Sequence, residues 1–190
     1  MKPKARLLLI IGPTAVGKST IIGRALKDFP ESLYDLITYT TRDRRSGESE
    51  GNPYHFVTED EFRRRIEQGF FIEWAVVHGR LYGTPRDQVE HHSKLGRIVT
   101  ADVDVQGAKT LLKEYPDAVT VFLKPPSIDA LRQRFIKRGV TSQADLMKRL
   151  ESAQKELSQA EDFQHAFVND DFETTYAEVR KIIEKMLQNQ

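Results

Sequence analysis

The sequence feature that most constrains the fold of this chain is the octapeptide Gly12-Pro13-Thr14-Ala15-Val16-Gly17-Lys18-Ser19. It matches the pattern G-x-x-x-x-G-K-[ST] of a P-loop at every fixed position. Glycines let such a loop curl so that successive backbone N–H groups point inward at phosphate oxygens. A chance match in a chain of this length is on the order of one in a hundred or rarer. We therefore expect this loop to bind a nucleoside triphosphate, and a structural turn with a solvated lysine is the less favoured interpretation.

The side chains in and near this loop suit the binding of ATP with Mg²⁺. Lys18 can reach the β- and γ-phosphates, and the Ser19 hydroxyl can ligate the metal ion. The helix expected from Lys18 to about Asp28 adds the positive end of its dipole. Asp102 follows a short apolar run, which places a carboxylate at the end of a neighbouring strand, where it can reach Mg²⁺ through water. Asp104 lies two residues further on, so the roles of the two aspartates are interchangeable at this point.

The elements around the loop predict an α/β fold. Leu7 to Ile11 is a short, wholly apolar run, which is typical of a strand buried on both faces. Further strands are expected at Arg97–Ala101, Ala118–Leu123 and His165–Val168, and further helices at Gln106–Glu114, Ile128–Lys137 and Phe172–Leu187. Strands that alternate with helices imply βαβ units around a parallel sheet. The expected fold class is a P-loop NTPase core of three layers with a parallel β-sheet.

Between about residues 35 and 90 the pattern changes to short segments separated by polar turns. Strand segments are expected at Asp35–Thr40, Tyr54–Val57 and Phe70–Val77. One helix is expected after Thr58, which precedes Glu61 at capping-box spacing, and another from Thr84, with Pro85 in its first turn. We interpret this region as an α+β insertion into the α/β core.

The whole chain is expected to form one domain over residues 1–190. Its core comprises residues 1–34 and 91–190, and the insertion comprises about 35–90. A small helical lid is expected at about 138–150, where Arg138-Gly139 leads into a long helix from about Ser142 to Glu161. Trp74 is expected to be a core residue rather than a stacking platform.

Composition excludes several classes of function. The 29 Lys and Arg residues nearly balance the 28 Asp and Glu residues. The net charge of +1 therefore creates no overall electrostatic field that would attract a nucleic acid or an acidic membrane. The absence of cysteine excludes disulfides, thiolate zinc sites and cysteine nucleophiles. The first apolar run, Leu7 to Ile11, is too short for a signal peptide, and no stretch approaches the ~20 apolar residues of a membrane span. We expect a cytoplasmic protein without nucleic-acid or membrane partners, of undetermined oligomeric state.

Along nearly its whole length the sequence resembles the guanylate kinases, which are P-loop nucleoside-monophosphate kinases. The segments that carry the resemblance are Thr40-Thr41-Arg42-x-x-Arg45, Gly51-x-x-Tyr54-x-Phe56-Val57, Phe71-Ile72-Glu73-Trp74-Ala75, Tyr82-Gly83-Thr84-Pro85, Asp102-Val103-Asp104-Val105-Gln106-Gly107, Pro125-Pro126-Ser127 and Val168-Asn169-Asp170. Their order and spacing together are specific. The resemblance implies that the insertion binds GMP and that the reaction converts GMP, and dGMP as well, to the diphosphate.

The resemblance also implies roles for individual residues. The residues expected to bind ATP are Gly12, Pro13, Thr14, Ala15, Val16, Gly17, Lys18, Ser19, Thr20 and Asn169, and those expected to hold Mg²⁺ are Ser19 and Asp102. The residues expected to bind GMP are Thr38, Arg42, Arg45, Tyr54, Glu73, Tyr82, Thr84 and Asp104. The residues expected to be catalytic are Lys18, Arg42, Arg134, Arg138 and Arg149. The two arginines of the GMP set suit a phosphate because their forked donors bond it bidentately.

Glu73 is the residue expected to select the base. Guanine presents two adjacent donors, N1–H and the 2-amino group, which one carboxylate can accept together. Adenine has an acceptor at N1 and nothing at C2, so it leaves the carboxylate unpaired, and such sites discriminate by roughly 10⁴-fold. By strand periodicity alone Glu73 is an outward-facing surface residue, and it is the resemblance that reverses this interpretation.

The expected reaction is direct in-line attack of a GMP phosphate oxygen on the γ-phosphorus of ATP, without a covalent enzyme intermediate. Closure of the lid and insertion is expected to exclude water, which would otherwise hydrolyse ATP. The chain departs from the family pattern at Thr38, Tyr39, Leu81 and Val140. Two alternatives are a same-fold kinase with another phosphorylated acceptor, such as ribose bisphosphate, and a non-catalytic guanylate-kinase-like interaction module. Glu73 counts against the first, and the intact Lys18-Ser19 pair counts against the second.

Overall fold

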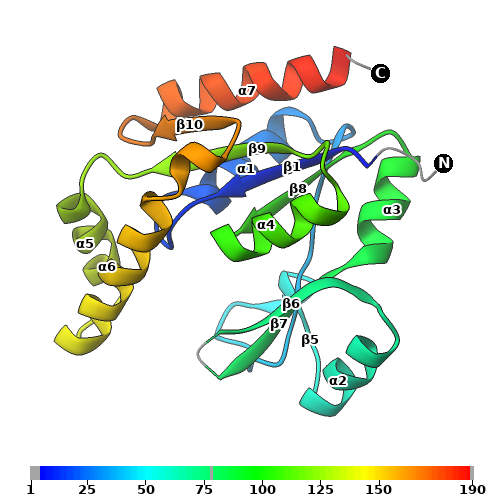
Figure 1. Cartoon of the computed structure of the whole chain (residues 1–190), viewed down its shortest axis with the longest axis horizontal. Helices are drawn as coiled ribbons and strands as arrows, with labels where there is room; N and C mark the ends of the chain where they lie inside the picture. The colour runs from blue at the N-terminus through cyan, green and yellow to red at the C-terminus, as the bar shows by residue number, and fades with distance from the viewer. Residues whose placement is uncertain (1–4, 78, 189–190) are drawn as a thin grey trace.

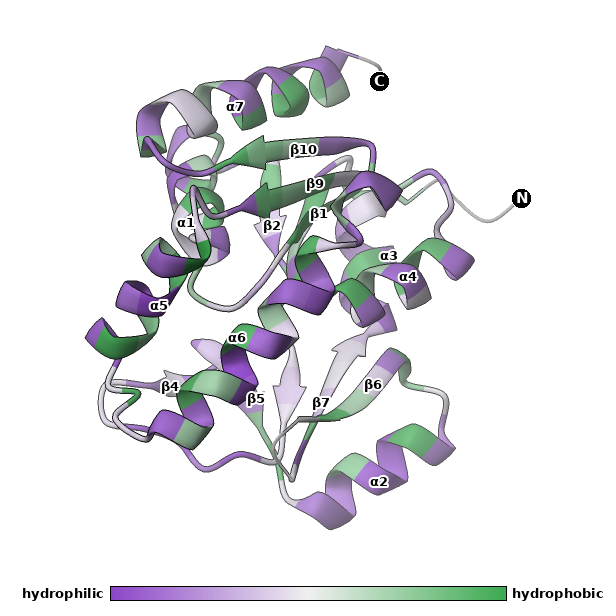
Figure 2. Cartoon of the chain, turned by 60° about the vertical axis from the view of Figure 1, so that its left-hand side comes forward, coloured by the Kyte–Doolittle hydropathy of each residue, from purple (hydrophilic) through white to green (hydrophobic). Residues whose placement is uncertain are grey.

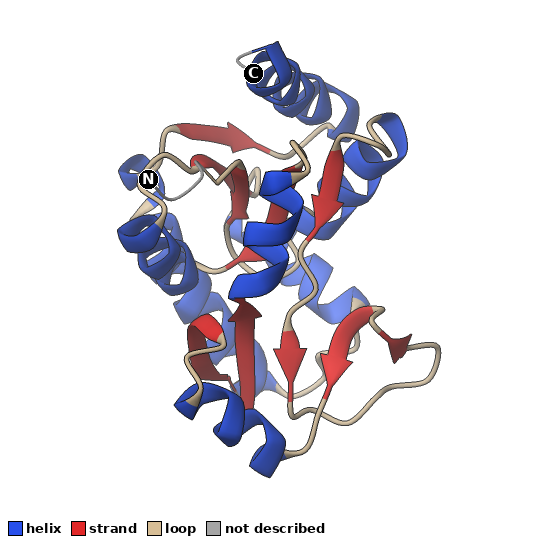
Figure 3. Cartoon of the chain, turned by 90° about the vertical axis from the view of Figure 1, so that its right-hand side faces the viewer, coloured by secondary structure: helices blue, strands red, loops and turns tan. Residues whose placement is uncertain are grey.

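The computed structural model describes residues 5–77 and 79–188 and contains two β-sheets, one above the other in the side view of Figure 3. The larger sheet has the strand order β10-β9-β1-β8-β2, and all of its neighbouring strands are parallel. Its strands are β1 (Leu7–Ile11), β2 (Leu33–Asp35), β8 (Ile98–Val103), β9 (Val119–Lys124) and β10 (His165–Val168). The predicted parallel sheet of an α/β fold is confirmed.

Helices cover both faces of this sheet, which makes three layers (Figure 1). The residues of β1 alternate between two hydrophobic clusters. Leu7, Leu9 and Ile11 pack with α3 (Arg86–Lys94) and α4 (Val105–Glu114), whereas Leu8 and Ile10 pack with α1 (Lys18–Asp28) and α7 (Phe172–Gln188). Each buried side chain of this kind contributes about 1.5–3 kcal/mol. Burial on both faces is the reason that β1 is apolar throughout, as its colour in Figure 2 shows.

The smaller sheet has the strand order β4-β5-β3-β7-β6. Its strands are β3 (Tyr39–Thr40), β4 (Ser49–Glu50), β5 (Pro53–Phe56), β6 (Phe71–Val77) and β7 (Arg80–Pro85), and α2 (Glu59–Glu67) packs against it. Phe62 of α2 is fully buried and stacks on Phe71 with ring centroids 4.5 Å apart. Thr58 caps α2 by accepting a hydrogen bond from the Glu61 N–H at 3.2 Å, which confirms that predicted helix start.

Three expectations for this part of the chain are wrong. Thr84 does not begin a helix, because it pairs with Glu73 in the β6–β7 hairpin and α3 starts only at Arg86. The expected segment Asp35–Thr40 is divided between the sheets, since Asp35 ends β2 and β3 begins at Tyr39. Trp74 is 48% exposed rather than in the core.

Two further helices, α5 (Ile128–Lys137) and α6 (Gln143–Leu157), project from the core beside the P-loop (Figure 1). Leu131 and Phe135 of α5 form a hydrophobic cluster with Leu146 and Ala153 of α6 and with Ala15 of the loop. The long helix expected to reach Glu161 ends at Leu157 and is followed by a short 3₁₀ helix at Ala160–Asp162. No helix within 5–77 and 79–188 has the length and apolar character needed to cross a bilayer.

Two crossings of the chain join the sheets, and one side chain ties them together. The Gln88 side chain on α3 accepts a hydrogen bond from the Ile37 N–H at 2.9 Å and donates one to the Ile37 carbonyl at 3.2 Å. Ile37 precedes β3, and Gln88 follows β7. The two hydrogen bonds therefore join the segment that enters the smaller sheet to the segment that leaves it. This pairing sets the position of the smaller sheet against the core.

Candidate active site

The P-loop follows the carboxyl end of β1 and leads into α1. Gly17 is the residue before α1 and has a φ of 112°, and Gly12 has a φ of 137°. A side chain at Gly12 would overlap the carbonyl oxygen of Leu123, and one at Gly17 would overlap the Asn169 side chain. Both fixed glycines are therefore required by the backbone shape of the loop. Ala15, with a φ of 68°, carries the kind of local strain that concentrates at binding sites.

Lys18 lies at the centre of the loop and is largely buried. Its Nζ atom donates to the carbonyl oxygens of Gly12 and Pro13 at 2.6 and 3.2 Å and lies 3.4 Å from Asp102 Oδ1. Burial raises the pKa of the Asp102 carboxyl, and the Lys18 ammonium and Arg138 act in the opposite direction. Although 42% of the Asp102 side chain is open to the cleft, protein surrounds its carboxylate closely enough for desolvation to dominate the pKa. Asp102 is thus the carboxylate beside the P-loop lysine.

Asp104, the other candidate, has a different environment. It is the residue before α4, and its Oδ1 atom accepts a hydrogen bond from the Gly107 N–H at 2.7 Å. The geometry therefore separates the two aspartates that the sequence left interchangeable. Of the remaining loop residues expected to touch ATP or the metal ion, Ser19 and Thr20 are exposed in the first turn of α1 and Thr14 is exposed in the loop.

Asn169 and Arg134 brace the loop from the side. Asn169 is only 6% exposed, and its Nδ2 atom donates to the Val16 carbonyl at 2.8 Å. Arg134 donates to the same carbonyl and to the Asn169 carbonyl, both at 3.1 Å. The Asn169 Oδ1 atom is buried without a hydrogen-bond partner in the described part of the chain. A buried acceptor left open in this way is suited to a donor on a ligand.

Arg149 faces the loop from α6. It lines a cavity of about 230 Å³ together with Pro13 and Thr14, and its Nε atom is 3.0 Å from Asp145 Oδ2. Arg138 is exposed at the end of α5. Arg134 and Arg149 thus lie beside the loop, but Arg134 is bound to main-chain oxygens and Arg149 to a carboxylate.

A second cavity, of about 220 Å³, lies between the two sheets. Six of the eight residues expected to bind GMP line it, namely Thr38, Tyr54, Glu73, Tyr82, Thr84 and Asp104. Asp102 lines it as well, so this cavity adjoins the carboxylate that lies 3.4 Å from the P-loop lysine. We call it the acceptor cavity. It also has lining residues that the sequence analysis did not single out as site residues, namely Trp74, Ala75, Val103, Gln106, Gly107 and Thr110.

Glu73 and Thr84 form one wall of the acceptor cavity. They are paired across the β6–β7 hairpin, and the Thr84 hydroxyl donates to Glu73 Oε1 at 2.5 Å. Two residues apart on a regular strand, Phe71 and Glu73 would share a face. A register shift between them breaks this rule, so Phe71 packs into the apolar cluster while Glu73 faces the cavity. Burial raises the pKa of Glu73, Thr84 opposes that shift, and Asp104 adds to it.

The remaining two residues of the expected GMP set, Arg42 and Arg45, are not among the residues that line the cavity. The guanidinium of Arg42 is 5.4 Å from the ring centroid of Tyr54, which does line the cavity. It also forms an ion pair with Glu48 at 2.8 Å. Arg45 is exposed, and its backbone N–H donates to the other oxygen of Glu48 at 2.8 Å. Glu48 is a site residue that the sequence analysis missed, because nothing in periodicity marks an ion pair within a loop.

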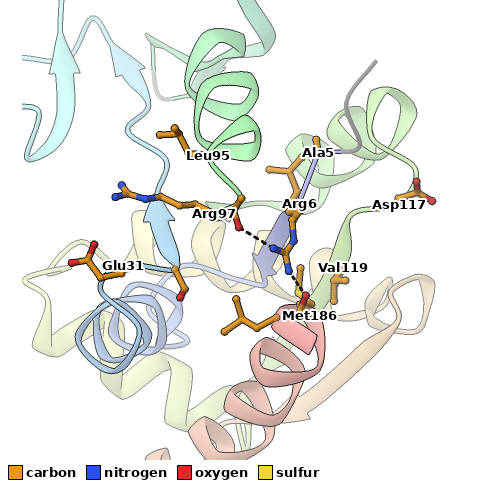
Figure 4. A pocket seen from close by; sticks show the side chains of 12 residues that line it. Ala5, Arg6, Glu31, Leu95, Arg97, Asp117, Val119 and Met186 are labelled. Carbon is orange, nitrogen blue, oxygen red and sulfur yellow. Dashed lines mark hydrogen bonds between the residues drawn. The ribbon is translucent and has the colours of Figure 1, made fainter. Parts of the chain in front are cut away.

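A third cavity, of about 680 Å³, lies at the opposite edge of the larger sheet (Figure 4). Its lining includes Arg6, Arg97 and Val119, which stand near the amino ends of β1, β8 and β9, whereas the P-loop follows the carboxyl end of β1. Arg6 donates to the Gly96 carbonyl at 2.8 Å and to the carbonyl of Met186 at the end of α7. The lining of this cavity includes no P-loop residue, so the cavity is distinct from the region around the P-loop.

The comparisons with known proteins agree with one another. The sequence model of the family named guanylate kinase matches residues 4–186. The guanylate kinase of Bdellovibrio bacteriovorus is 40% identical over 184 residues, which cover 97% of this chain and 99% of that protein. The guanylate kinase of Thermotoga maritima is 42% identical over 180 residues, 95% of this chain and 86% of that one. The crystal structure of guanylate kinase from Anaplasma phagocytophilum superposes with a TM-score of 0.75 at 30% identity, covering 97% of this chain and 87% of that one.

Proposed function

Because the chain belongs to the guanylate kinase family, we propose that it transfers the γ-phosphate of ATP to GMP by direct in-line attack. It is a nucleoside-monophosphate kinase, and ATP-dependent phosphorylation of GMP is its general reaction. The proposal includes dGMP as an acceptor, because the guanine edge and the phosphate are the same in both nucleotides.

The observation that carries the proposal is the carboxylate of Glu73 in the wall of the acceptor cavity. One of its oxygens accepts from Thr84, and both oxygens have further lone pairs for the N1–H and 2-amino donors of guanine. Thr38 and Asp104 line the same cavity and are the proposed partners for the rest of the base. Adenine would offer the half-buried carboxylate no donors from the base, which supports rejection of AMP by roughly 10⁴-fold.

The acceptor phosphate is proposed to bind beside Tyr54 and Tyr82, whose rings are 5.8 Å apart. Arg42 and Arg45 supply the positive charge at this end of the site. Guanidinium groups offer planar, forked donors that match the oxygens of a phosphate. With guanine at Glu73 and phosphate at Arg42, the acceptor would span the cavity toward Asp102 and the P-loop.

The triphosphate of ATP is proposed to lie on the backbone N–H groups of the P-loop, from Gly12 to Thr20, with Lys18 between the β- and γ-phosphates. The unsatisfied Oδ1 atom of Asn169 suits the amino group of adenine. Guanine has an oxygen where adenine has that amino group, so the same atom would disfavour GTP as the donor.

Mg²⁺ suits the donors that are present, namely the exposed Ser19 hydroxyl and the Asp102 carboxylate. Few protein ligands are expected, because Mg²⁺ keeps waters and binds substrate phosphates as well. No cluster of three or more His, Cys, Asp or Glu side chains that could form an all-protein metal site exists among residues 5–77 and 79–188. When bound, the metal ion supplies neutralisation of the charge on the phosphates.

The transferring group carries dispersed negative charge, and we propose that Lys18, Arg42, Arg134, Arg138 and Arg149 offset it. Arg149 would have to exchange its contact with Asp145, one turn away on the same helix, for the substrate, and a change of its side-chain rotamer would bring this about. Movement of α6 toward the P-loop would then carry Arg149 to the γ-phosphate. The same movement would exclude water from the γ-phosphate.

The test offers GMP, dGMP, AMP, CMP and UMP separately with ATP and Mg²⁺ and measures ADP release. GMP and dGMP should react, and AMP at the GMP rate would overturn the assignment of the base site. Glu73→Gln should lower kcat/KM for GMP by at least about 10-fold, since a hydrogen bond to a charged group is lost, with ATP binding unchanged. Glu67→Gln, at the far end of α2 and exposed, is the matched control.

A further inference from the structure

We propose that Glu48 is a positioning residue that holds Arg42 and Arg45 ready for the acceptor phosphate. The inference rests on the proposed function, because it takes the anion at these arginines to be the phosphate of a nucleoside monophosphate. It assigns a role to a carboxylate that the reaction itself does not use.

The two arginines lie in a segment with no regular structure to hold them. They fall between the end of β3 at Thr40 and the start of β4 at Ser49. Long side chains on such a segment lose rotamer freedom when they bind a ligand, and the like charges of Arg42, Arg44 and Arg45 repel each other. A binding-ready arrangement therefore requires an internal contact that orders the segment.

Glu48 provides this contact with both of its carboxylate oxygens. Oε1 is 2.8 Å from Arg42 Nη2, and Oε2 accepts from the Arg45 backbone N–H at 2.8 Å. The Glu48 N–H in turn donates to the Arg45 carbonyl at 3.1 Å, which closes the turn. One side chain thus fixes the guanidinium of one arginine and the main chain of the other.

The pair is sheltered from solvent, unlike its neighbour in the same region. The side chains of Arg42 and Glu48 are 14% and 17% exposed, whereas those of Arg44 and Glu50 are 51% and 49% exposed. Sheltered charge pairs are screened less than exposed ones. The hydrogen bond from Arg42 lowers the pKa of the Glu48 carboxyl, which keeps this residue ionised.

The contact leaves Arg42 able to bind a phosphate. Its Nη1 atom donates to the Asp43 carbonyl at 2.7 Å and its Nη2 atom to Glu48, while the group stands over the rings of Tyr54 and Phe56 at 5.4 and 5.5 Å. A guanidinium has five N–H donors, so donors remain for a ligand. The aromatic contacts and Glu48 together fix the plane of the group beside the acceptor cavity.

Positioning and simple charge pairing predict opposite results for Glu48→Gln. The substitution keeps the shape and one acceptor oxygen but removes a negative charge near the phosphate. If Glu48 only competed with the phosphate for Arg42, its removal would tighten GMP binding. If it positions the arginines, GMP binding weakens although the site becomes more positive. Glu48→Asp keeps the charge but shortens the reach, so positioning predicts weaker GMP binding there too.

The experiment measures binding of GMP and of guanosine, which lacks the phosphate, to the purified full chain by calorimetry. For both variants we expect the Kd of GMP to rise about 10-fold, as for the loss of a hydrogen bond to a charged group, and that of guanosine to change less than about twofold. The KM for GMP should rise similarly, with the KM for ATP unchanged. Glu50→Gln removes the same charge from the exposed pair and should leave all of these values unchanged.

The outcomes separate the two proposals. Unchanged or tighter GMP binding in Glu48→Gln would overturn the positioning role, and so would equal weakening of GMP and guanosine, which indicates general disruption of the insertion. If the unsubstituted protein bound guanosine and GMP equally, the proposed phosphate site would be wrong, and this inference would fall with it. If Glu48→Gln did not fold, Glu48→Asp, with its charge retained, would decide the question. The quantity compared would again be the change in the Kd of GMP relative to the change in the Kd of guanosine.

Discussion

The carboxyl group of Glu156 on α6 should make the stability of this protein depend on pH, and Glu156→Gln should remove that dependence. Its Oε2 atom is buried without a hydrogen-bond partner in the described part of the chain. Burial raises the pKa of Glu156 from 4.5 to about 7. The Lys18 ammonium and a hydrogen bond with Ser152 oppose the shift, and the Asp104 carboxylate adds to it.

The sign and size of the effect follow from the raised pKa of Glu156. Between pH 4.5 and about 7 the folded protein holds a proton that the unfolded chain releases, so the free energy of unfolding falls as pH rises. At about 1.4 kcal/mol per pKa unit, the loss across this window reaches at most about 3 kcal/mol. Glutamine stays neutral, so this contribution is absent from the variant.

The assay is urea unfolding of both proteins at several values between about pH 4.5 and about pH 8, analysed by linear extrapolation. The stability of Glu156→Gln relative to the unsubstituted protein should increase across the range by up to about 3 kcal/mol. Asp35, whose pKa is raised to about 6 mainly by burial, titrates in both proteins, so it cancels from the difference. The matched control is Glu151→Gln, exposed on the same helix. A difference that stays constant within about 0.5 kcal/mol would refute the reasoning, because burial of the carboxyl would then carry no proton linkage.

Three further predictions concern packing and backbone shape. Gly12→Ala should abolish ATP binding in a calorimetric titration, because the added carbon would overlap the carbonyl oxygen of Leu123 at a φ of 137°. Gly23→Ala should instead raise the free energy of unfolding by about 0.5–1 kcal/mol in urea, since this position is helical and nothing lies within 4 Å of the added carbon. Phe62→Ala should lower it by about 3–5 kcal/mol, because the ring is fully buried against Phe71, and hydrogen exchange should accelerate in the smaller sheet; unchanged exchange there would contradict the assignment of its core.

The features of the fold that the sequence predicted are those that leave a pattern within a short stretch of chain. The apolar run of β1 and the cap at Thr58 each leave such a pattern, and both are where the patterns indicated. The strand β7 was missed, because its residues are held by pairing with β6, and the Thr84-Pro85 sequence also suits a helix start. Asp35 and Tyr39 belong to different sheets, which no periodicity over so short a segment can reveal.

The same distinction applies to the candidate site. The P-loop pattern alone predicted a curled loop between a buried strand and a helix, and the structure has it there, because the loop shape follows from its glycines. The direction of Glu73 depends on a register shift that periodicity does not record, so only the family resemblance pointed to it. Glu48 and Glu156 gave no signal at all, since their importance lies in burial and in partners that the folded chain supplies.

The division into two sheets has a consequence for how such an enzyme can diversify. The residues proposed to hold the triphosphate follow β1, whereas four of the six expected GMP-binding residues that line the acceptor cavity, Glu73 and Thr84 among them, belong to the smaller sheet. Substitutions on that sheet can therefore exchange one acceptor for another while the donor machinery is inherited intact. The core also contributes to this cavity, because Asp104 and residues of α4 line it, so such a lineage would also have to change residues of the core.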